Sequence, residues 1–295
     1  MTILICSDGT PASEHAIHIG GLLAKATHAR TTLLGIAEQS VDEAALRQAL
    51  DKQATALLNA GIDPRIVVGS GEPIRQILSE TSANKYDLVV IGARHKESSG
   101  LFWRSQRTYE LIKTIESPVM VAIGKRERLA RFLVCTGGKH YIDEAVKLTA
   151  NFAAALNAEV TLLHVMPEPP AIFASLARME SDVDTVLASG SDLGRSLSAQ
   201  RGAFQKLGVT AHIHLRHGLV VDEVFKEVND GDYDVIVSGS SRARGPLRHY
   251  IMGDLTRSIL NRSQCPVLVA RSASVKSGAG FLFRLWRRIF NPAGP

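Results

Sequence analysis

The sequence has few of the residues that mark a secreted or metal-bound protein. Its 295 residues include only three cysteines, Cys6, Cys135 and Cys265, and no pair of them has a CxxC spacing. This spacing argues against a disulfide framework and against a cysteine zinc site. We expect three free, buried thiols in a reducing compartment.

Long apolar runs are also missing. No stretch approaches the roughly 20 apolar residues that cross a bilayer. The first residues show neither the basic segment nor the small-residue cleavage site of a signal peptide. The sequence therefore predicts a cytoplasmic protein.

The net charge of the sequence is small except in its last 24 residues, 272–295. The net charge is +5, and residues 272–295 contain four basic residues and no acidic one, which leaves +1 on residues 1–271. Nucleic-acid binding needs many basic groups on one face. A nearly neutral body therefore predicts no nucleic-acid partner.

What the sequence does have is an internal repeat. Four segments of the first half recur in the same order in the second half, at offsets that rise from 129 to 147 and 148 residues. The rise in offset places an insertion near 166–190. The matched pairs are 3–9 with 132–138, 32–34 with 161–163, 86–92 with 233–239, and 117–122 with 265–270.

Each copy alternates short apolar strands with helical stretches, which predicts an α/β fold with a parallel sheet. The strands lack polar alternation, as expected where helices cover both faces of a sheet. Strands are predicted near 3–6, 31–37, 64–68, 86–91 and 118–123, and near 131–136, 159–165, 209–216, 233–238 and 266–271. Helices are predicted at 42–59, 73–83 and 106–115, and Pro11 suits the first turn of another.

Two motifs resemble those of a known family. Ser7-Asp8-Gly9-Thr10 follows the first strand, and Ser117-Pro118-Val119 and Cys265-Pro266-Val267 open the last strand of each copy. They resemble the opening and closing motifs of the universal stress proteins, over about residues 1–271. The resemblance implies a flavodoxin-like domain with five parallel strands in the order 3-2-1-4-5. It also implies that such domains pair, often through their last strands.

The resemblance further implies an adenine-nucleotide site, with ATP or a related nucleotide as ligand. In the family, the aspartate after the first strand contacts the adenine, and a loop of the form Gly-two-Gly-nine-Gly-Ser/Thr wraps the phosphates. Glycines let the backbone approach a phosphate, and the next helix offers free N–H groups.

Neither copy has the whole motif. The first keeps Asp8 and Gly92, but His95 and Ser105 replace later glycines. The second keeps Gly239 and Gly253, but Gly137 replaces the aspartate. We therefore expect weak, asymmetric binding. The candidate ligand-binding residues are Asp8, Gly9, Thr10, Gly92, Arg94, Gly137, Gly138, Gly239, Ser240, Arg242 and Gly253.

Catalysis has little support in the sequence. No Ser/His/Asp arrangement or motif-placed carboxylate pair is present, so no catalytic residue is assigned. The segment 136–139 has a distant likeness to the phosphate loop of ATP pyrophosphatases, which keeps an ATP-using enzyme as an alternative. His212 and His214 share a strand face, with His217 nearby. We favour an exposed strand edge there and assign no metal site.

Two further features complete the sequence prediction. The repeated Tyr86-Asp87 and Tyr233-Asp234 pairs favour a structural role at the start of a strand. The insertion has a helical pattern from Phe173 to Leu187, and it either covers the second ligand cleft or lies on the surface.

The segment 281–290 combines seven apolar residues with three arginines in a pattern typical of an amphipathic helix. An anionic membrane, a protein partner and the protein's own body are the alternative surfaces for it.

The domains are thus predicted at 1–124 and 131–271, followed by a basic tail at 272–295. We expect two separate five-stranded domains that form an intramolecular pseudo-dimer rather than one continuous sheet, with further self-association left open. The predicted function is non-catalytic stress response or regulation. A ligand-free interaction scaffold is another alternative.

Overall fold

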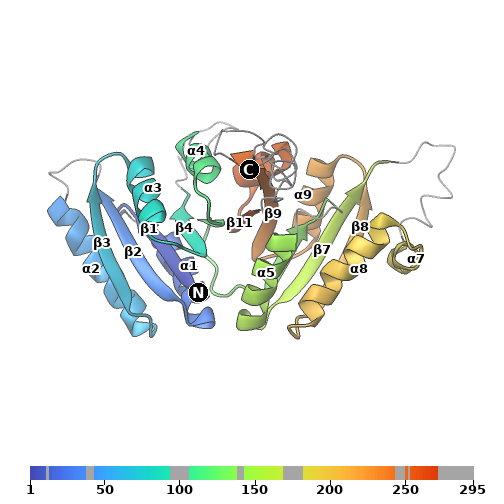
Figure 1. Cartoon of the computed structure of the whole chain (residues 1–295), viewed down its shortest axis with the longest axis horizontal. Coiled ribbons are helices and arrows are strands. Elements are labelled where there is room, and N and C mark those ends of the chain that lie inside the picture. The colour runs from blue at the N-terminus through green and yellow to red at the C-terminus, as the bar shows by residue number, and fades with distance from the viewer. Residues whose placement is uncertain are drawn as a thin grey trace, which may run out of the picture.

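The computed structural model describes residues 1–10, 13–37, 43–93, 106–137, 143–168, 182–242, 250–251 and 253–271. Figure 1 shows the two halves side by side, each with helices on both faces of a sheet. The first half contains β1 (Thr2–Ser7), α1 (Glu14–Thr27), β2 (Arg30–Ala37), α2 (Glu43–Asn59), β3 (Pro64–Ser70), α3 (Pro73–Ala83), β4 (Leu88–Gly92), α4 (Gln106–Thr114) and β5 (Val119–Ala122).

The second half repeats this order and adds two elements, α7 and β10. It contains β6 (Arg131–Cys135), α5 (Asp143–Leu156), β7 (Glu159–Met166), α7 (Val183–Ala188), α8 (Asp192–Gln205), β8 (Ala211–His217), α9 (Val220–Asp230), β9 (Val235–Arg242), β10 (Tyr250–Ile251), α10 (Asp254–Arg262) and β11 (Val267–Arg271). The predicted strands and helices of both halves are confirmed, with bounds that differ by a few residues.

Each half has the predicted strand order. The first runs β3-β2-β1-β4-β5, and the second runs β8-β7-β6-β9-β11, with parallel pairing inside each half. The α/β prediction and the flavodoxin-like order are therefore confirmed.

The expectation that the two sheets stay separate is wrong. β5 pairs antiparallel with β11, with Met120 opposite Leu268, so the strands of both halves form one continuous sheet. Short, apolar last strands leave unpaired backbone groups at the edge of each half, and this pairing satisfies them. The predicted intramolecular pseudo-dimer is confirmed, and it is joined through its last strands.

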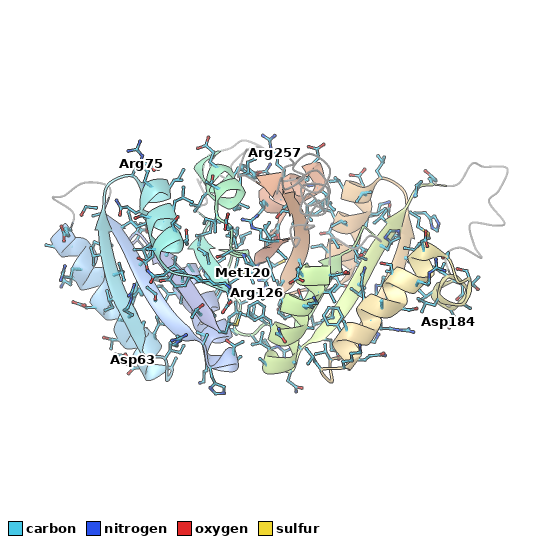
Figure 2. The ribbon with its side chains drawn as sticks, in the orientation of Figure 1. Asp63, Arg75, Met120, Arg126, Asp184 and Arg257 are labelled. Carbon is cyan, nitrogen blue, oxygen red and sulfur yellow. The ribbon has the colours of Figure 1, made fainter. Side chains whose placement is uncertain are left out.

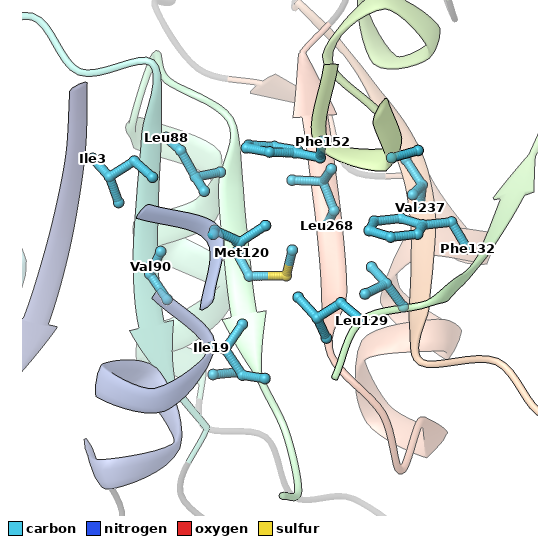
Figure 3. Close-up of a cluster of buried hydrophobic side chains, with 14 of the residues drawn as sticks. Ile3, Ile19, Leu88, Val90, Met120, Leu129, Phe132, Phe152, Val237 and Leu268 are labelled. Atoms are coloured by element: carbon cyan, nitrogen blue, oxygen red, sulfur yellow. The ribbon is translucent and has the colours of Figure 1, made fainter. Parts of the chain in front are cut away.

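The core extends across this joint on both faces of the sheet. Figure 3 shows Met120 and Leu268 together among side chains from both halves, and both residues are fully buried. On one face, residues of α1, α2, α5 and α8 form a single buried cluster, and residues of α3, α4, α9 and α10 belong to the cluster on the other. Strands buried on both faces explain the absence of polar alternation in the sequence.

Polar contacts reinforce the joint. Arg271 at the end of β11 is 6% exposed, and its Nε donates to the Ser117 carbonyl at 3.0 Å. Its guanidinium also donates to the Ile112 carbonyl and to Ser240 Oγ. Across the neighbouring helices, the Tyr109 hydroxyl donates to Asn261 Oδ1. The bonds to Ser117, Ile112 and Asn261 cross between the two halves and fix their relative position.

Only part of the insertion lies within the described residues. The helix α7 packs against α8, and the Val186 carbonyl lies so close to Gly194 that a side chain there would clash. Figure 1 places α7 at the outer side of the second half, and Figure 2 labels Asp184 there. This part of the insertion is therefore a surface excursion. The predicted helix over 173–187 coincides with α7 only at its end, and its residues 173–181 lie outside the described residues, as does the tail at 272–295.

Candidate functional site

The candidate site lies where the strand order reverses. In each half, the first and fourth strands are parallel neighbours, and the crossovers leave them in opposite directions. Ligands of open α/β sheets bind beyond the carboxyl ends of such strands. Asp8 and Gly92 lie at this position in the first half, and Gly137 and Gly239 lie there in the second.

In the first half, the loop after β1 is tightly organised. One carboxylate oxygen of Asp8, Oδ1, accepts hydrogen bonds from the Thr10 backbone N–H at 3.0 Å and from the Thr10 hydroxyl at 2.6 Å. Gly9 has a φ of +74°, and a side chain there would meet Leu46 and Ala49 of α2. Asp8 therefore stabilises its own turn, a role that any ligand contact would have to share.

A buried hydroxyl network lies behind this turn. Ser7 Oγ lies 2.9 Å from Ser13 Oγ and 2.7 Å from Gln53 Oε1, and it accepts a bond from the Gly9 N–H at 3.0 Å. Gln53 belongs to α2. The network ties α2 to the loop and holds the Asp8 backbone in place.

At the equivalent position of the second half, only Gly137 lies within the described residues. Among the described residues, no atom lies within 4 Å of a side chain built at Gly137. The Thr136 carbonyl is 2.9 Å from His164 Nδ1 of β7. The second half therefore has no carboxylate at the position of Asp8.

The glycine positions lie within or beside regular elements. Gly92 ends β4 and pairs with Ala122. Gly239 and Ser240 lie inside β9, where the Ser240 hydroxyl donates to the Ala270 carbonyl. Gly253 precedes α10, and Asp254 begins that helix. Arg94 and Gly138 lie outside the described residues.

The strand β10 was not predicted from the sequence. It pairs antiparallel with the end of β9, so Tyr250 lies opposite Arg242 and Ile251 lies opposite Ser241. This ribbon occupies part of the segment in which the family's phosphate loop would lie, and it contacts α4 of the first half. The extra residue in the second copy therefore accompanies a longer fourth strand.

The repeated Tyr-Asp pairs have the predicted structural role. Asp87 accepts from the Thr2 N–H at 2.8 Å, and Asp234 accepts from the Arg131 N–H at 3.0 Å. Each aspartate thus fixes the start of the first strand against the start of the fourth. The prediction is confirmed in both halves.

The tyrosines lead to two carboxylates that sequence analysis missed. Tyr86 donates to Glu80 at 2.6 Å, and Tyr233 donates to Glu227 at 2.6 Å. Glu80 and Glu227 are 147 residues apart, which is the offset of the Tyr-Asp pairs. Burial and the hydrogen bond to Glu227 raise the pKa of Tyr233 to about 12. An alignment of the two copies carried through the helices would have identified these carboxylates.

Glu227 is the more heavily bonded of the two. It accepts from His214 Nδ1 at 2.8 Å and from Arg216 Nε at 2.6 Å, and its side chain is only 5% exposed. Burial opposes ionisation, but the hydrogen bonds from Tyr233, His214 and Arg216 outweigh it and hold the pKa of Glu227 below its ordinary value. Glu227 is therefore an ionised, buried carboxylate at neutral pH.

The histidines and cysteines singled out in the sequence lie in separate places. His212 and His214 share one face of β8, an outer strand of the sheet, as predicted. Within the described residues, no three His, Cys, Asp or Glu side chains are grouped to hold a metal ion. All three cysteines are free and buried, and burial raises the pKa of Cys6 and Cys135 to about 12. None of the described helices has the length and apolar character needed to cross a membrane.

Together, the fold and site define a class of protein: a doubly wound α/β domain, duplicated and joined through its last strands. The universal stress protein family matches residues 1–122 and 129–271, and the chain belongs to that family.

Known proteins match the chain as a whole or by halves. A universal stress protein from Archaeoglobus fulgidus has a similar structure over 92% of this chain and 98% of its own, with a TM-score of 0.69 and 17% identity. One from Methanothermobacter thermautotrophicus is 23% identical over 146 residues, which are 50% of this chain and 98% of that protein. Another, solved in complex with cAMP, is 18% identical over 50% of this chain and all of its own, with a TM-score of 0.35.

Proposed function

We propose that the chain is a non-catalytic stress-response or regulatory protein that binds an adenine nucleotide weakly and at one half only. The observation that carries this proposal is the contrast at the end of the first strand. Asp8 is present in the first half, whereas Gly137 takes its place in the second. The switch point of the sheet is the expected ligand position in both halves.

The first half is the better candidate site. Its turn presents Asp8, Gly9 and Thr10 on a backbone that the Ser7 network holds in place. In the second half, the carboxylate of Asp254 stands at the start of α10, where a phosphate would bind, and like charges repel. An incomplete glycine motif in the first half agrees with weak binding.

A thermal-shift screen with ATP, ADP and AMP tests the proposal, because a ligand that binds only the folded state raises its stability. We expect one of the nucleotides to raise the melting temperature of the wild type. Asp8→Ala should abolish the shift. Asp8→Asn removes the charge but keeps the turn, since its amide oxygen still accepts from Thr10, so it distinguishes a loss of charge from a loss of turn structure. Gly137→Ala is the matched control in the second half. No shift with any nucleotide would contradict binding.

Two alternatives remain proposals of a different class. An ATP-using enzyme would act through the segment 136–139, and nucleotide turnover above background in purified protein would favour it. A ligand-free scaffold would show no nucleotide shift and would bind partners through its surface or through 281–290. Co-sedimentation with anionic vesicles, with and without residues 272–295, tests the membrane form of this alternative. Cytoplasmic location and further self-association stay predictions.

A further inference from the structure

A second hollow lies far from the candidate nucleotide site. The β8–α9 cleft has a volume of about 440 Å³ and lies between β8 and the end of α9. It is lined by the first residues of β6 and β7, by one face of β8 and by the last turn of α9. Its lining includes Arg131, Glu159, His212, Asp230, Gly231 and Tyr233. These residues lie toward the amino ends of the strands, opposite the switch-point loops.

The first half shows what fills the equivalent space. Thr32 of β2 pairs with Arg65, and the equivalent Thr161 of β7 pairs with His212, so His212 takes the place of Arg65. The Arg65 guanidinium lies 2.9 Å from Glu80, and Asn84 Nδ2 donates to the same oxygen at 3.0 Å. In the first half, a guanidinium and an amide therefore occupy this position.

The second half lacks both of these groups. A shorter imidazole replaces the guanidinium at 212, and Gly231 replaces Asn84 at the end of the helix. Glu227 is bonded instead by His214 and Arg216, which lie farther along β8. Glu227 thus has its hydrogen bonds from another direction than Glu80, and the cleft lies where the first half has the Arg65 side chain.

The charge of the cleft favours a cation. Glu159, Glu227 and Asp230 face Arg131 and Arg216, which leaves one net negative charge when His212 and His214 are neutral. Arg216 already bridges Glu227 at 2.6 Å and Asp230 at 2.7 Å, and the exposed Asp232 lies 3.8 Å from Arg131. The cleft also receives the carboxyl-terminal end of α9, which carries a partial negative charge.

We propose that the β8–α9 cleft binds a small molecule that bears a guanidinium group. The guanidinium would lie in the space that Arg65 fills in the first half, near Asp230, Glu159 and the last carbonyls of α9. Planar guanidinium groups form paired hydrogen bonds with carboxylates, and the cleft has the size of a small-ligand site. This inference does not depend on nucleotide binding.

Calorimetric titration of the full chain with N-butylguanidinium tests the proposal. N-butylurea is its neutral isostere, and N-butylammonium tests whether any monocation suffices. We expect butylguanidinium to bind and both analogues to bind at least about tenfold more weakly. Absence of butylguanidinium binding up to about 10 mM, or equal binding of butylurea, would overturn the proposal.

Two variants locate the site. His212→Arg restores the first-half residue, so its tethered guanidinium should fill the cleft and weaken butylguanidinium binding at least about tenfold. Its melting temperature reports that the fold is retained. Asp230→Asn should also weaken binding, whereas Asp63→Asn, an exposed carboxylate of the first half, should not. Unchanged binding in both His212→Arg and Asp230→Asn would refute the assignment to this cleft.

Discussion

Glu80 in the first half and Glu227 in the second occupy the same place in the fold, but different side chains surround them. Glu80 is bonded by Arg65, Asn84 and Tyr86, whereas Glu227 is bonded by His214, Arg216 and Tyr233. The tyrosine is kept because it joins the helix before the fourth strand to that strand. The arginine that bonds the carboxylate lies farther along the outer strand in the second half, at Arg216 of β8, than Arg65 does on β3. The comparison teaches that a buried carboxylate must be satisfied, but that its partners are free to change.

The two halves also differ at the carboxyl ends of their strands, where a ligand would bind. The first half has Asp8 in a packed turn, and the second has Gly137 at that position and an added β10 strand. The joint between the halves uses β5 and β11, which carry nearly the same sequence motif. The halves are therefore closely alike in the strands that join them, and they differ where a ligand would bind.

The largest expected effect comes from the joint. Leu268→Asp places an unpaired charge in the fully buried centre of the sheet, and we expect the free energy of unfolding to fall by more than about 4 kcal/mol. Chemical denaturation measures the loss. Ile66→Asp is the control, since Ile66 is 41% exposed on the outer strand β3 and should lose less than about 1 kcal/mol. Similar losses in the two variants would show that the joint contributes no more to stability than the outer strand does.

Removing the carboxylates of Glu80 and Glu227 sharpens the comparison. We expect Glu227→Ala to lower the free energy of unfolding by about 3 kcal/mol, because it leaves buried partners, including Arg216, without an acceptor. Glu80→Ala should cost about 2 kcal/mol, since Arg65 is 59% exposed and turns to water. Denaturant titration of both variants checks the order. A larger loss for Glu80→Ala would contradict the account of the two networks.

Arg271 tests whether polar bonds also hold the halves together. Arg271→Met keeps much of the side-chain volume but removes bonds to Ser117, Ile112 and Ser240, so we expect a loss of about 2 kcal/mol. Arg75→Met is the matched control, because Figure 2 shows Arg75 at the outer surface of α3. Equal stability of Arg271→Met and the wild type would mean that apolar packing alone fixes the joint.

The smallest effect is a dependence on pH. The pKa of Glu227 is lower in the folded state than its ordinary value of 4.5 in the unfolded chain, so its ionisation stabilises the fold above about pH 4.5. That contribution is lost as the pH falls through the lower folded pKa. The stability difference between the wild type and Glu227→Gln should therefore shrink between pH 6 and about pH 3. A difference that stays constant over this range would contradict the lowered pKa.

The sequence was sufficient for the elements of each half. Strands buried on both faces appear as continuous apolar runs, and the repeat allowed each half to check the other. The continuous sheet was missed because the pairing of Met120 with Leu268 depends on two edges that are far apart in sequence. The ribbon of β9 and β10 was missed because its pairing is only two residues long.

The candidate site was predicted less completely. Asp8 and Gly137 lie at equivalent strand ends as expected, since the repeat fixes them. Gly239 and Ser240 lie inside a strand, which depends on how far β9 extends beyond its counterpart β4. The cleft beside His212 depends on a register between β7 and β8 that no local pattern contains.

Nucleotide stoichiometry tests the central claim most directly, because the claim is that two copies of one fold have diverged at their ligand ends. Isothermal titration of the full chain with the nucleotide that gives the largest thermal shift measures how many molecules bind per chain. The account predicts one weak site, at least about tenfold weaker in Asp8→Ala and unchanged in Gly137→Ala. Two equivalent sites per chain, or a single site that responds to Gly137→Ala and not to Asp8→Ala, would contradict it.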